Sequence, residues 1–164
     1  MHNTDAGNLG ENHVTLGCFE VGGHTYAIDV AQVREVVRWQ AVTPLPNAPS
    51  LIEGVIDLRG AVVPVVDLGR ALGGAPVAPG QRTRIAVTEV DGLVMGLAVD
   101  AAVEVLSVDV GNLEDPPTLA TQTGYDVTRA VVRRPGAEPI LVLSLEHVLE
   151  GVYRSALSAK EAGE

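Results

Sequence analysis

Apolar residues along this chain are grouped in short runs with a period close to two, a pattern that predicts strands rather than helices. Neighbouring runs are joined by turn-forming residues, so we predict four hairpins. The predicted strands and turns are 14–21, Gly22-Gly23 and 24–30; 54–58, Arg59-Gly60 and 61–67; 84–90, Asp91-Gly92 and 93–99; and 126–133, a loop over 134–138 and 139–145. Pro64 lacks the N–H for a ladder hydrogen bond, which indicates an edge or a bulge at that point.

Helical segments are predicted to be few and short. Asp29 or a neighbour begins a short helix through residues 33–37, and residues 68–72 make about one helical turn. Asp29, Asp67 and Asp100 each follow a predicted strand. A carboxylate there accepts hydrogen bonds from the free N–H groups of a helix start, so we expect these three residues to be helix caps.

The order of hairpin, short helix, connection, hairpin and terminal helix occurs twice. Residues 98–105 repeat the pattern of residues 27–36 with two residues fewer. Two copies of about 70 residues are each too small for a large core, so we expect two small β-barrels packed together with a groove between them.

We place one domain over residues 14–152, and a Gly/Pro run over 73–80 is its only plausible internal boundary. Lobe one is expected over about 14–80 and lobe two over about 81–152, and an exchange of strands between the lobes stays open. The polar residues 1–13 and 154–164 are expected to be flexible tails.

The composition agrees with this plan. The chain has 164 residues, among them 27 Val, 18 Gly and 10 Pro but one Phe and one Trp, which is typical of short strands joined by tight turns. The single cysteine, Cys18, excludes an intramolecular disulfide and fits a reducing compartment, so we expect a cytoplasmic protein without a secretory signal or a membrane span. Because Cys18 lies in the first predicted strand, we expect a buried and unreactive thiol.

The charge of the chain argues against two classes of partner. Eleven Lys and Arg against 21 Asp and Glu give a formal net charge of −10, and the sequence pI is near 4.7. Such a chain lacks the positive surface that replaces counterions around nucleic acid or binds an anionic membrane. We therefore expect no nucleic-acid partner and no direct membrane insertion.

Residues that could carry catalysis are few. The four histidines, His2, His13, His24 and His147, are scattered, and none has a metal-like spacing to another His or to Cys18. The sequence has no G-x-S-x-G elbow, no G-x-x-x-x-G-K-[ST] loop and no G-x-G-x-x-G fingerprint. We expect no catalytic residue, no metal, no cofactor and no enzymatic activity.

Several segments carry a resemblance to a known family. Residues 26–37 and 44–49 are followed by Ile-Glu-Gly-Val-Ile-Asp-Leu-Arg-Gly over 52–60 and by Val-Pro-Val-Val-Asp-Leu over 63–68. In order and spacing these segments resemble the CheW family of bacterial chemotaxis coupling proteins, and residues 96–106 of the second half agree. The resemblance extends from about residue 14 to residue 149.

The resemblance implies a mainly β fold of two small SH3-like five-stranded β-barrel lobes packed together, with short helices and a C-terminal helix. It also implies a non-enzymatic adaptor, recruited to membrane-bound receptor arrays. Such an adaptor couples the cytoplasmic tips of methyl-accepting chemoreceptors to the regulatory domain of a CheA-like histidine kinase. The receptor tip is expected in the apolar groove between the lobes and the kinase domain edgewise on one lobe, and weak self-association stays open.

The resemblance also assigns interface residues. Four apolar residues match positions that the family uses toward the receptor groove, with burial in the core as the alternative: Ile28, Val33, Val36 and Val99. Arg59 and Gly60 in the predicted turn, together with Glu35, are expected at an interface with the receptor or the kinase. The alternative for Arg59 is an internal ion pair with Glu35 or Glu53.

Three residues depart from the family pattern or stand out in it. Asp57 stands where the family usually has Asn and could draw Arg59 into an internal pair, Arg84 stands where an apolar residue is common, and Trp39 follows the predicted short helix. Two further interpretations therefore stay open: a specialised CheW-like paralogue that serves another receptor–kinase system, such as twitching or surface behaviour, and one that limits array growth. A small β-barrel enzyme that binds ligand in the groove is a remote alternative.

Overall fold

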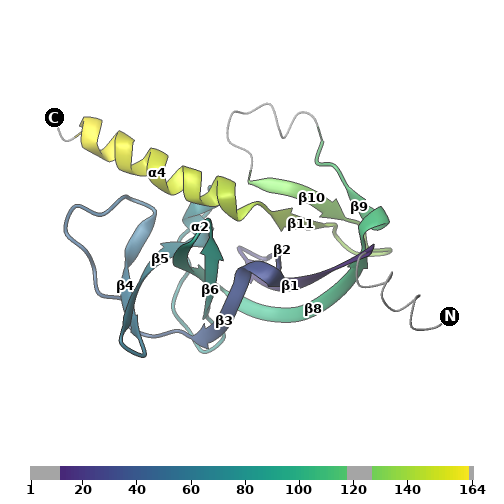
Figure 1. Ribbon diagram of the computed structural model, residues 1–164, viewed down its shortest axis with the longest axis horizontal. Coiled ribbons are helices and arrows are strands. Elements are labelled where there is room, and N and C mark those ends of the chain that lie inside the picture. Colours follow the sequence, from purple (N-terminus) through teal and green to yellow (C-terminus); the bar gives the residue numbers. More distant parts are fainter. Residues whose placement is uncertain (1–11, 118–126, 163–164) are drawn as a thin grey trace.

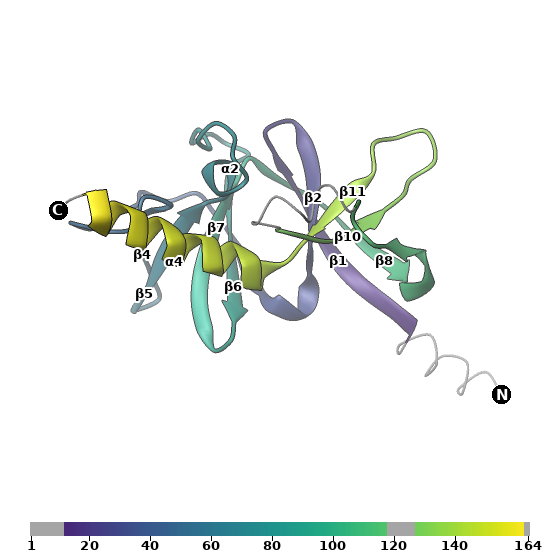
Figure 2. The same cartoon turned by 90° about the horizontal axis from the view of Figure 1, so that it is seen from above.

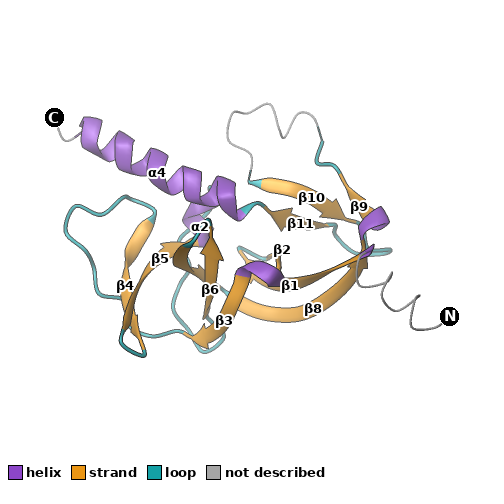
Figure 3. Ribbon diagram, viewed as in Figure 1, coloured by secondary structure: helices purple, strands orange, loops and turns teal. Residues whose placement is uncertain are grey.

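The computed structural model describes residues 12–117 and 127–162 (Figures 1 and 3). Its strands are β1 (His13–Val21), β2 (His24–Asp29), β3 (Val33–Arg38), β4 (Ile52–Leu58), β5 (Ala61–Asp67), β6 (Arg84–Val90), β7 (Leu93–Val99), β8 (Ala101–Asp109), β9 (Leu113–Glu114), β10 (Thr128–Val132) and β11 (Ile140–Leu143). Its helices are the 3-10 turns η1 (Val30–Gln32) and η2 (Val110–Asn112) and the α-helices α2 (Leu68–Ala71) and α4 (Leu145–Ala162).

The four predicted hairpins are confirmed. β1 pairs with β2, β4 with β5, β6 with β7 and β10 with β11, all antiparallel. In the β4–β5 turn both central residues have positive φ, 52° at Arg59 and 86° at Gly60, which is the geometry of a primed turn between twisted strands. The mainly β fold expected from the sequence is therefore correct.

The strands of the two halves are exchanged between two sheets. A six-stranded sheet has the order β8-β1-β2-β11-β10-β9, and a five-stranded sheet has the order β3-β6-β7-β5-β4. Figure 2 shows the two sheets side by side, with the first hairpin grouped with the strands of the second half. The lobe bounds of about 14–80 and 81–152 therefore do not match the two sheets, because residues 73–80 connect two strands of the same sheet, and the exchange of strands that the sequence left open is present. One lobe also has six strands rather than the expected five.

Several local expectations are corrected. The helix expected to continue through Val33 ends as the single 3-10 turn η1, because the β-branched residues that follow pair with β6 as strand β3. Asp29 and Asp67 do cap η1 and α2, but Asp100 accepts a hydrogen bond from the N–H of Gly22 at 2.7 Å and caps no helix. The tail expected from residue 154 is helical as far as Ala162, as part of α4.

Pro64 lies in an interior strand, since β5 is flanked by β4 and β7. The pairing of β5 with β7 begins only at Val65, opposite Gly96. On its other side Pro64 lies opposite Val55 of β4, whose N–H and C=O bond Thr43 instead. Pro64 is therefore accommodated in an interior strand, and the edge expected from the sequence is wrong.

Three clusters of buried side chains hold the fold together. One lies within the six-stranded sheet and includes Leu16 and Ile140, and a second lies within the five-stranded sheet and includes Ile56 and Ile85. The third draws on both sheets and on α4, and its members include Phe19, Ile28, Val66, Leu97, Val99, Leu145 and Val148. The two lobes therefore share a core, which α4 covers along the five-stranded sheet (Figures 1 and 2).

The five-stranded sheet curls until its two end strands approach each other. Just beyond β3, Thr43 exchanges two backbone hydrogen bonds of 2.8 Å with Val55 of β4. Gly54 makes this approach possible, because a Cβ at that position would lie 2.2 Å from the carbonyl oxygen of Thr43. The sheet is in this way closed toward a small barrel.

We expect Gly54→Ala to lower the free energy of unfolding by about 2–4 kcal/mol, because the new methyl group must displace backbone rather than a flexible side chain. Chemical denaturation monitored by circular dichroism measures this loss. Gly80→Ala is the control, since its Cβ would meet only the hydroxyl of Thr83 at an ordinary 3.7 Å. Equal stability of the two variants would contradict the close approach at Gly54.

Candidate functional site

A groove with apolar walls lies between the two sheets. It is bounded by β3, an end strand of the five-stranded sheet, and by β8, an end strand of the six-stranded sheet. It encloses about 370 Å³. We call it the valine groove, and it is lined by Gly17, Cys18, Phe19, Val30, Val33, Val36, Ala102, Val103, Glu104 and Val105.

A β-bulge aims two residues of β3 into the valine groove. Val33 lies opposite Thr88 of β6. Val36 lies opposite Ala86, which is two residues from Thr88 and therefore on the same face. The register shifts between Val33 and Glu35, so Arg34 is the extra residue of a bulge. Without the bulge, Val33 and Val36 would point to opposite faces of the sheet.

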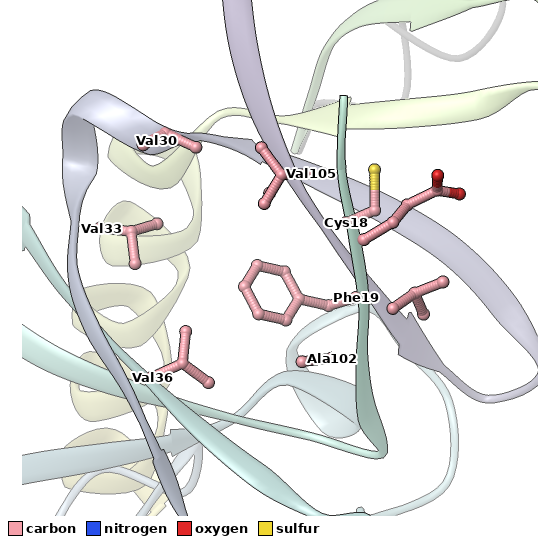
Figure 4. Close-up of a pocket in the computed structure, with 10 residues that line it drawn as sticks. Cys18, Phe19, Val30, Val33, Val36, Ala102 and Val105 are labelled. Carbon is pink, nitrogen blue, oxygen red and sulfur yellow. The ribbon is translucent and has the colours of Figure 1, made fainter. Parts of the chain in front are cut away.

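A second bulge does the same on β8. Gly17 and Phe19 share one face of β1, and they lie opposite Val105 and Ala102 of β8. The register shifts between these two pairs, so Ala102 and Val105 share a face although they are three residues apart. Figure 4 shows the ring of Phe19 between the valines of the two walls.

Cys18 and Glu104 line the groove from behind its wall. They lie opposite each other on the alternate face of β1 and β8, and Figure 4 shows the Cys18 side chain on the far side of the strand from Phe19. The side chains of Val30, Val33, Val36, Ala102 and Val105, which bound the hollow around Phe19, are hydrocarbon.

The groove walls expose more apolar surface than a folded monomer needs. The exposed fractions are 41% for Val36 on one wall and 68% for Val105 on the other. Val30 and Val103 are also exposed. A contiguous exposed apolar surface of this kind is typical of a protein-binding site.

A bidentate ion pair lies beside the groove. The guanidinium of Arg59 donates from Nη1 to Oε1 of Glu35 at 3.1 Å and from Nη2 to Oε2 of the same carboxylate. This hydrogen bonding lowers the pKa of Glu35 below its usual value. Because Glu35 lies on β3 and Arg59 in the β4–β5 turn, the pair joins the two end strands of the five-stranded sheet.

Comparison with known proteins assigns the family. A family model described as the CheW-like domain matches residues 15–152. This chain belongs to the CheW-like domain family. The chemotaxis protein CheW of Rhizobium meliloti (strain 1021) is 34% identical over 149 residues, which cover 88% of this chain and 96% of that protein.

Two further similarities broaden this result. Protein FrzA of Myxococcus xanthus is 30% identical over 141 residues, which cover 86% of this CheW-like chain and 88% of that protein. The crystal structure of the scaffolding protein TtCheW from Thermoanaerobacter tengcongensis superposes with a TM-score of 0.73 at 30% identity, covering 82% of this chain and 86% of that one. The resemblance seen in the sequence is confirmed, and the chain is of the chemotaxis scaffold or adaptor type.

The structure separates the four apolar residues expected at the groove of this CheW-like chain. Val33 and Val36 line it. Ile28 and Val99 are fully buried in the shared core, which is the alternative left open by the sequence, and they offer no surface to a partner. Sequence reasoning missed the second wall on β8, although the Val-Glu-Val of residues 103–105 repeats the Glu-Val of residues 35–36.

The residues expected around the turn have distinct roles. Arg59 makes the internal pair with Glu35 rather than with Glu53. Asp57 accepts a hydrogen bond from the N–H of Gly60 at 2.9 Å, which stabilises the turn. The guanidinium of Arg84 is bound locally, by the carbonyl oxygens of Gln81 and Thr83.

Within the described residues, no helix is both long and apolar enough to cross a membrane.

We expect Cys18 to resist alkylation in the folded protein. It is 1% exposed, and burial together with the nearby charge of Glu104 raises its pKa to about 11. At pH 8 such a thiol is ionised to about one part in a thousand. Iodoacetamide labelling followed by mass spectrometry should detect almost no adduct in buffer and complete reaction in denaturant. Equal rates in both conditions would contradict the burial of the thiol.

At pH values above the ordinary glutamate pKa of about 4.3, we expect Glu53→Gln to raise the free energy of unfolding by less than about 1 kcal/mol. Burial and the neighbouring carboxylate of Asp67 raise the pKa of Glu53. The folded protein thus holds this proton more tightly than the unfolded chain, so the ionised carboxylate costs stability that returns as the pH falls.

Glu35→Gln is the control of opposite sign. The pKa of Glu35 is lowered, so its ionised form stabilises the fold above its usual pKa and this contribution is lost as the pH falls through the lowered value. Melting temperatures at pH 4 and pH 7.5 test both variants. If Glu53→Gln lost stability at pH 7.5, the unfavourable burial of that carboxylate would be refuted.

Proposed function

We propose that this chain is a non-enzymatic adaptor that couples methyl-accepting chemoreceptors to a CheA-type histidine kinase. The observation that carries the proposal is the valine groove, a hydrocarbon-walled hollow exposed between the two lobes of a chain in the CheW-like family. In the proposed complex the cytoplasmic tip of a receptor lies in this groove. The adaptor is cytoplasmic and reaches the membrane only through the receptors that it binds.

The chemistry of the groove favours the apolar face of a helix as its occupant. Val33 and Val36 on one wall and Ala102 and Val105 on the other present branched or small aliphatic groups on both sides of Phe19. An amphipathic helix places residues i, i+3, i+4 and i+7 along one stripe, and such a stripe packs into a groove of this kind. A helical receptor tip satisfies its own backbone hydrogen bonds, so apolar walls suffice.

A second surface is needed for the kinase, because the groove is occupied by the receptor. The proposed surface is an edge of one lobe outside the groove, where the regulatory domain of the kinase docks. Arg59, Gly60 and Glu35 remain proposed interface residues, since the Arg59 side chain is 70% exposed while it binds Glu35. Its remaining N–H groups can reach a partner's carbonyl or carboxylate groups. Weak self-association through lobe edges is compatible with this arrangement.

Three alternatives are distinguished from this proposal by other observations. Protein FrzA, a relative that does not carry the CheW name, is 30% identical, and this supports keeping open which receptor–kinase system the chain serves. A paralogue that limits array growth would lower the activity of a reconstituted receptor–kinase complex, whereas a coupling adaptor raises it. The enzyme alternative requires polar groups that converge in the groove, and the walls around Phe19 are hydrocarbon.

We expect Val36→Asp and Val105→Asp each to weaken binding of a chemoreceptor cytoplasmic fragment by at least about tenfold. A carboxylate desolvated against an apolar partner surface costs more than about 1.4 kcal/mol, which corresponds to that factor. Isothermal titration calorimetry with a fragment from the same host measures the affinity.

Val62→Asp is the matched control, because Val62 is 69% exposed, as Val105 is at 68%, but lies on β5 outside the groove. It should bind the receptor fragment like the parent chain. The groove variants should still bind the kinase regulatory domain. If the parent chain bound neither partner at tens of micromolar, the proposed function would be refuted. If all three variants lost receptor affinity equally, the valine groove would not be the receptor-binding site.

A further inference from the structure

The two walls of the valine groove are built in the same way. Glu35 directly precedes the groove residue Val36, and Glu104 directly precedes the groove residue Val105. A bulge residue comes before each Glu. By strand register both carboxylates lie on the face turned away from the groove, Glu35 opposite Val87 and Glu104 opposite Cys18.

Each carboxylate is matched by an arginine from another part of its own sheet. On the five-stranded sheet this is Arg59, which joins the two end strands as described above. On the six-stranded sheet it is Arg134, in the connection between β10 and β11, whose Nη1 lies 3.6 Å from Oε2 of Glu104 on β8. β8 is one end of that sheet and β10 is next to the other end, so this contact also spans a curled sheet.

Arg134 is held more deeply than Arg59. Its side chain is 34% exposed against 70% for Arg59. Its Nε is buried, and in the described part of the chain that atom has no hydrogen-bond partner. A buried N–H without an acceptor costs free energy, so a compensating interaction must hold the guanidinium in place. The carboxylate that faces it is Glu104.

We propose that Arg134 and Glu104 are positioning residues whose ion pair closes the six-stranded sheet and holds β8 so that Ala102 and Val105 face β3 across the valine groove. The Arg134–Glu104 pair, which we call the clamp, is the counterpart of the pair between Arg59 and Glu35. Each of the two pairs lies on the side of its groove wall that faces away from the groove. The effect of the clamp on partner binding rests on the proposed function. Its effect on β8 is independent of that function.

Hydrogen exchange of the free protein tests the effect on β8. In Arg134→Gln and in Glu104→Gln, the amides of residues 102–106 should exchange faster, while those of residues 33–38 keep the parent rates. Glu35→Gln should give the converse pattern. Arg133→Gln is the matched control, because the neighbouring Arg133 is 79% exposed and binds Glu114 instead. Its exchange should be unchanged in both segments.

The same variants test the consequence for binding. Arg134→Gln should weaken binding of the chemoreceptor cytoplasmic fragment about two- to fivefold, the range for a partly exposed ion pair, with the loss appearing in affinity and not in stoichiometry. The double variant of Arg134→Gln with Glu104→Gln should lose no more than either single variant, because both remove one interaction. Exchanging the charges, Arg134→Glu with Glu104→Arg, should recover part of the loss.

Unchanged exchange over residues 102–106 in both single variants overturns the proposal, as does equal acceleration in both walls. If the parent chain binds no receptor fragment, the proposed function fails while the exchange experiment still decides the role of the clamp. If exchange responds and binding does not, the clamp is structural and its proposed effect on the groove is refuted.

Discussion

The rest of the structure depends on the hydrophobic cluster that the two sheets share. Each sheet encloses a small core of its own, and each is too small to supply much stability alone. The third cluster joins them, with Phe19 and Ile28 from one sheet, Leu97 and Val99 from the other and Val148 from α4. Exchange of strands reinforces this joining, because a first hairpin inserted among the strands of the second half ties the lobes together through the backbone.

The groove is a consequence of where that shared core ends. The hollow lies between β3, an end strand of one sheet, and β8, an end strand of the other, and the interior strand β1 contributes Phe19 to it. An end strand with strict alternation would offer the groove every second residue. The bulges at Arg34 and Val103 change that alternation and place pairs of apolar residues three apart on the groove face, close to the repeat of one helical turn.

The hairpins could be predicted from sequence because turn chemistry and alternation are local. Turns such as Asp91-Gly92 and Arg59-Gly60 set both the position and the register of their strands. The assignment of hairpins to sheets depends on contacts between distant segments, such as the parallel pairing of β2 with β11, and no local pattern records it. The continuation of α4 to Ala162 was missed for a related reason, since its polar sequence gives little indication of what it packs against.

The site could be predicted only in part, because motif position and side-chain direction are different properties. Ile28 and Val36 are both aliphatic residues of one motif, but Ile28 is 0% exposed and Val36 is 41% exposed. Ile28 lies on the interior strand β2, whereas Val36 lies on the end strand β3, where a bulge two residues earlier turns it toward the groove. The motif encodes neither the place of a strand in its sheet nor a bulge. In this fold the binding surface is set by backbone geometry at two sheet edges. Interactions that fix those edges from behind therefore bear on binding as directly as the valines that touch the partner.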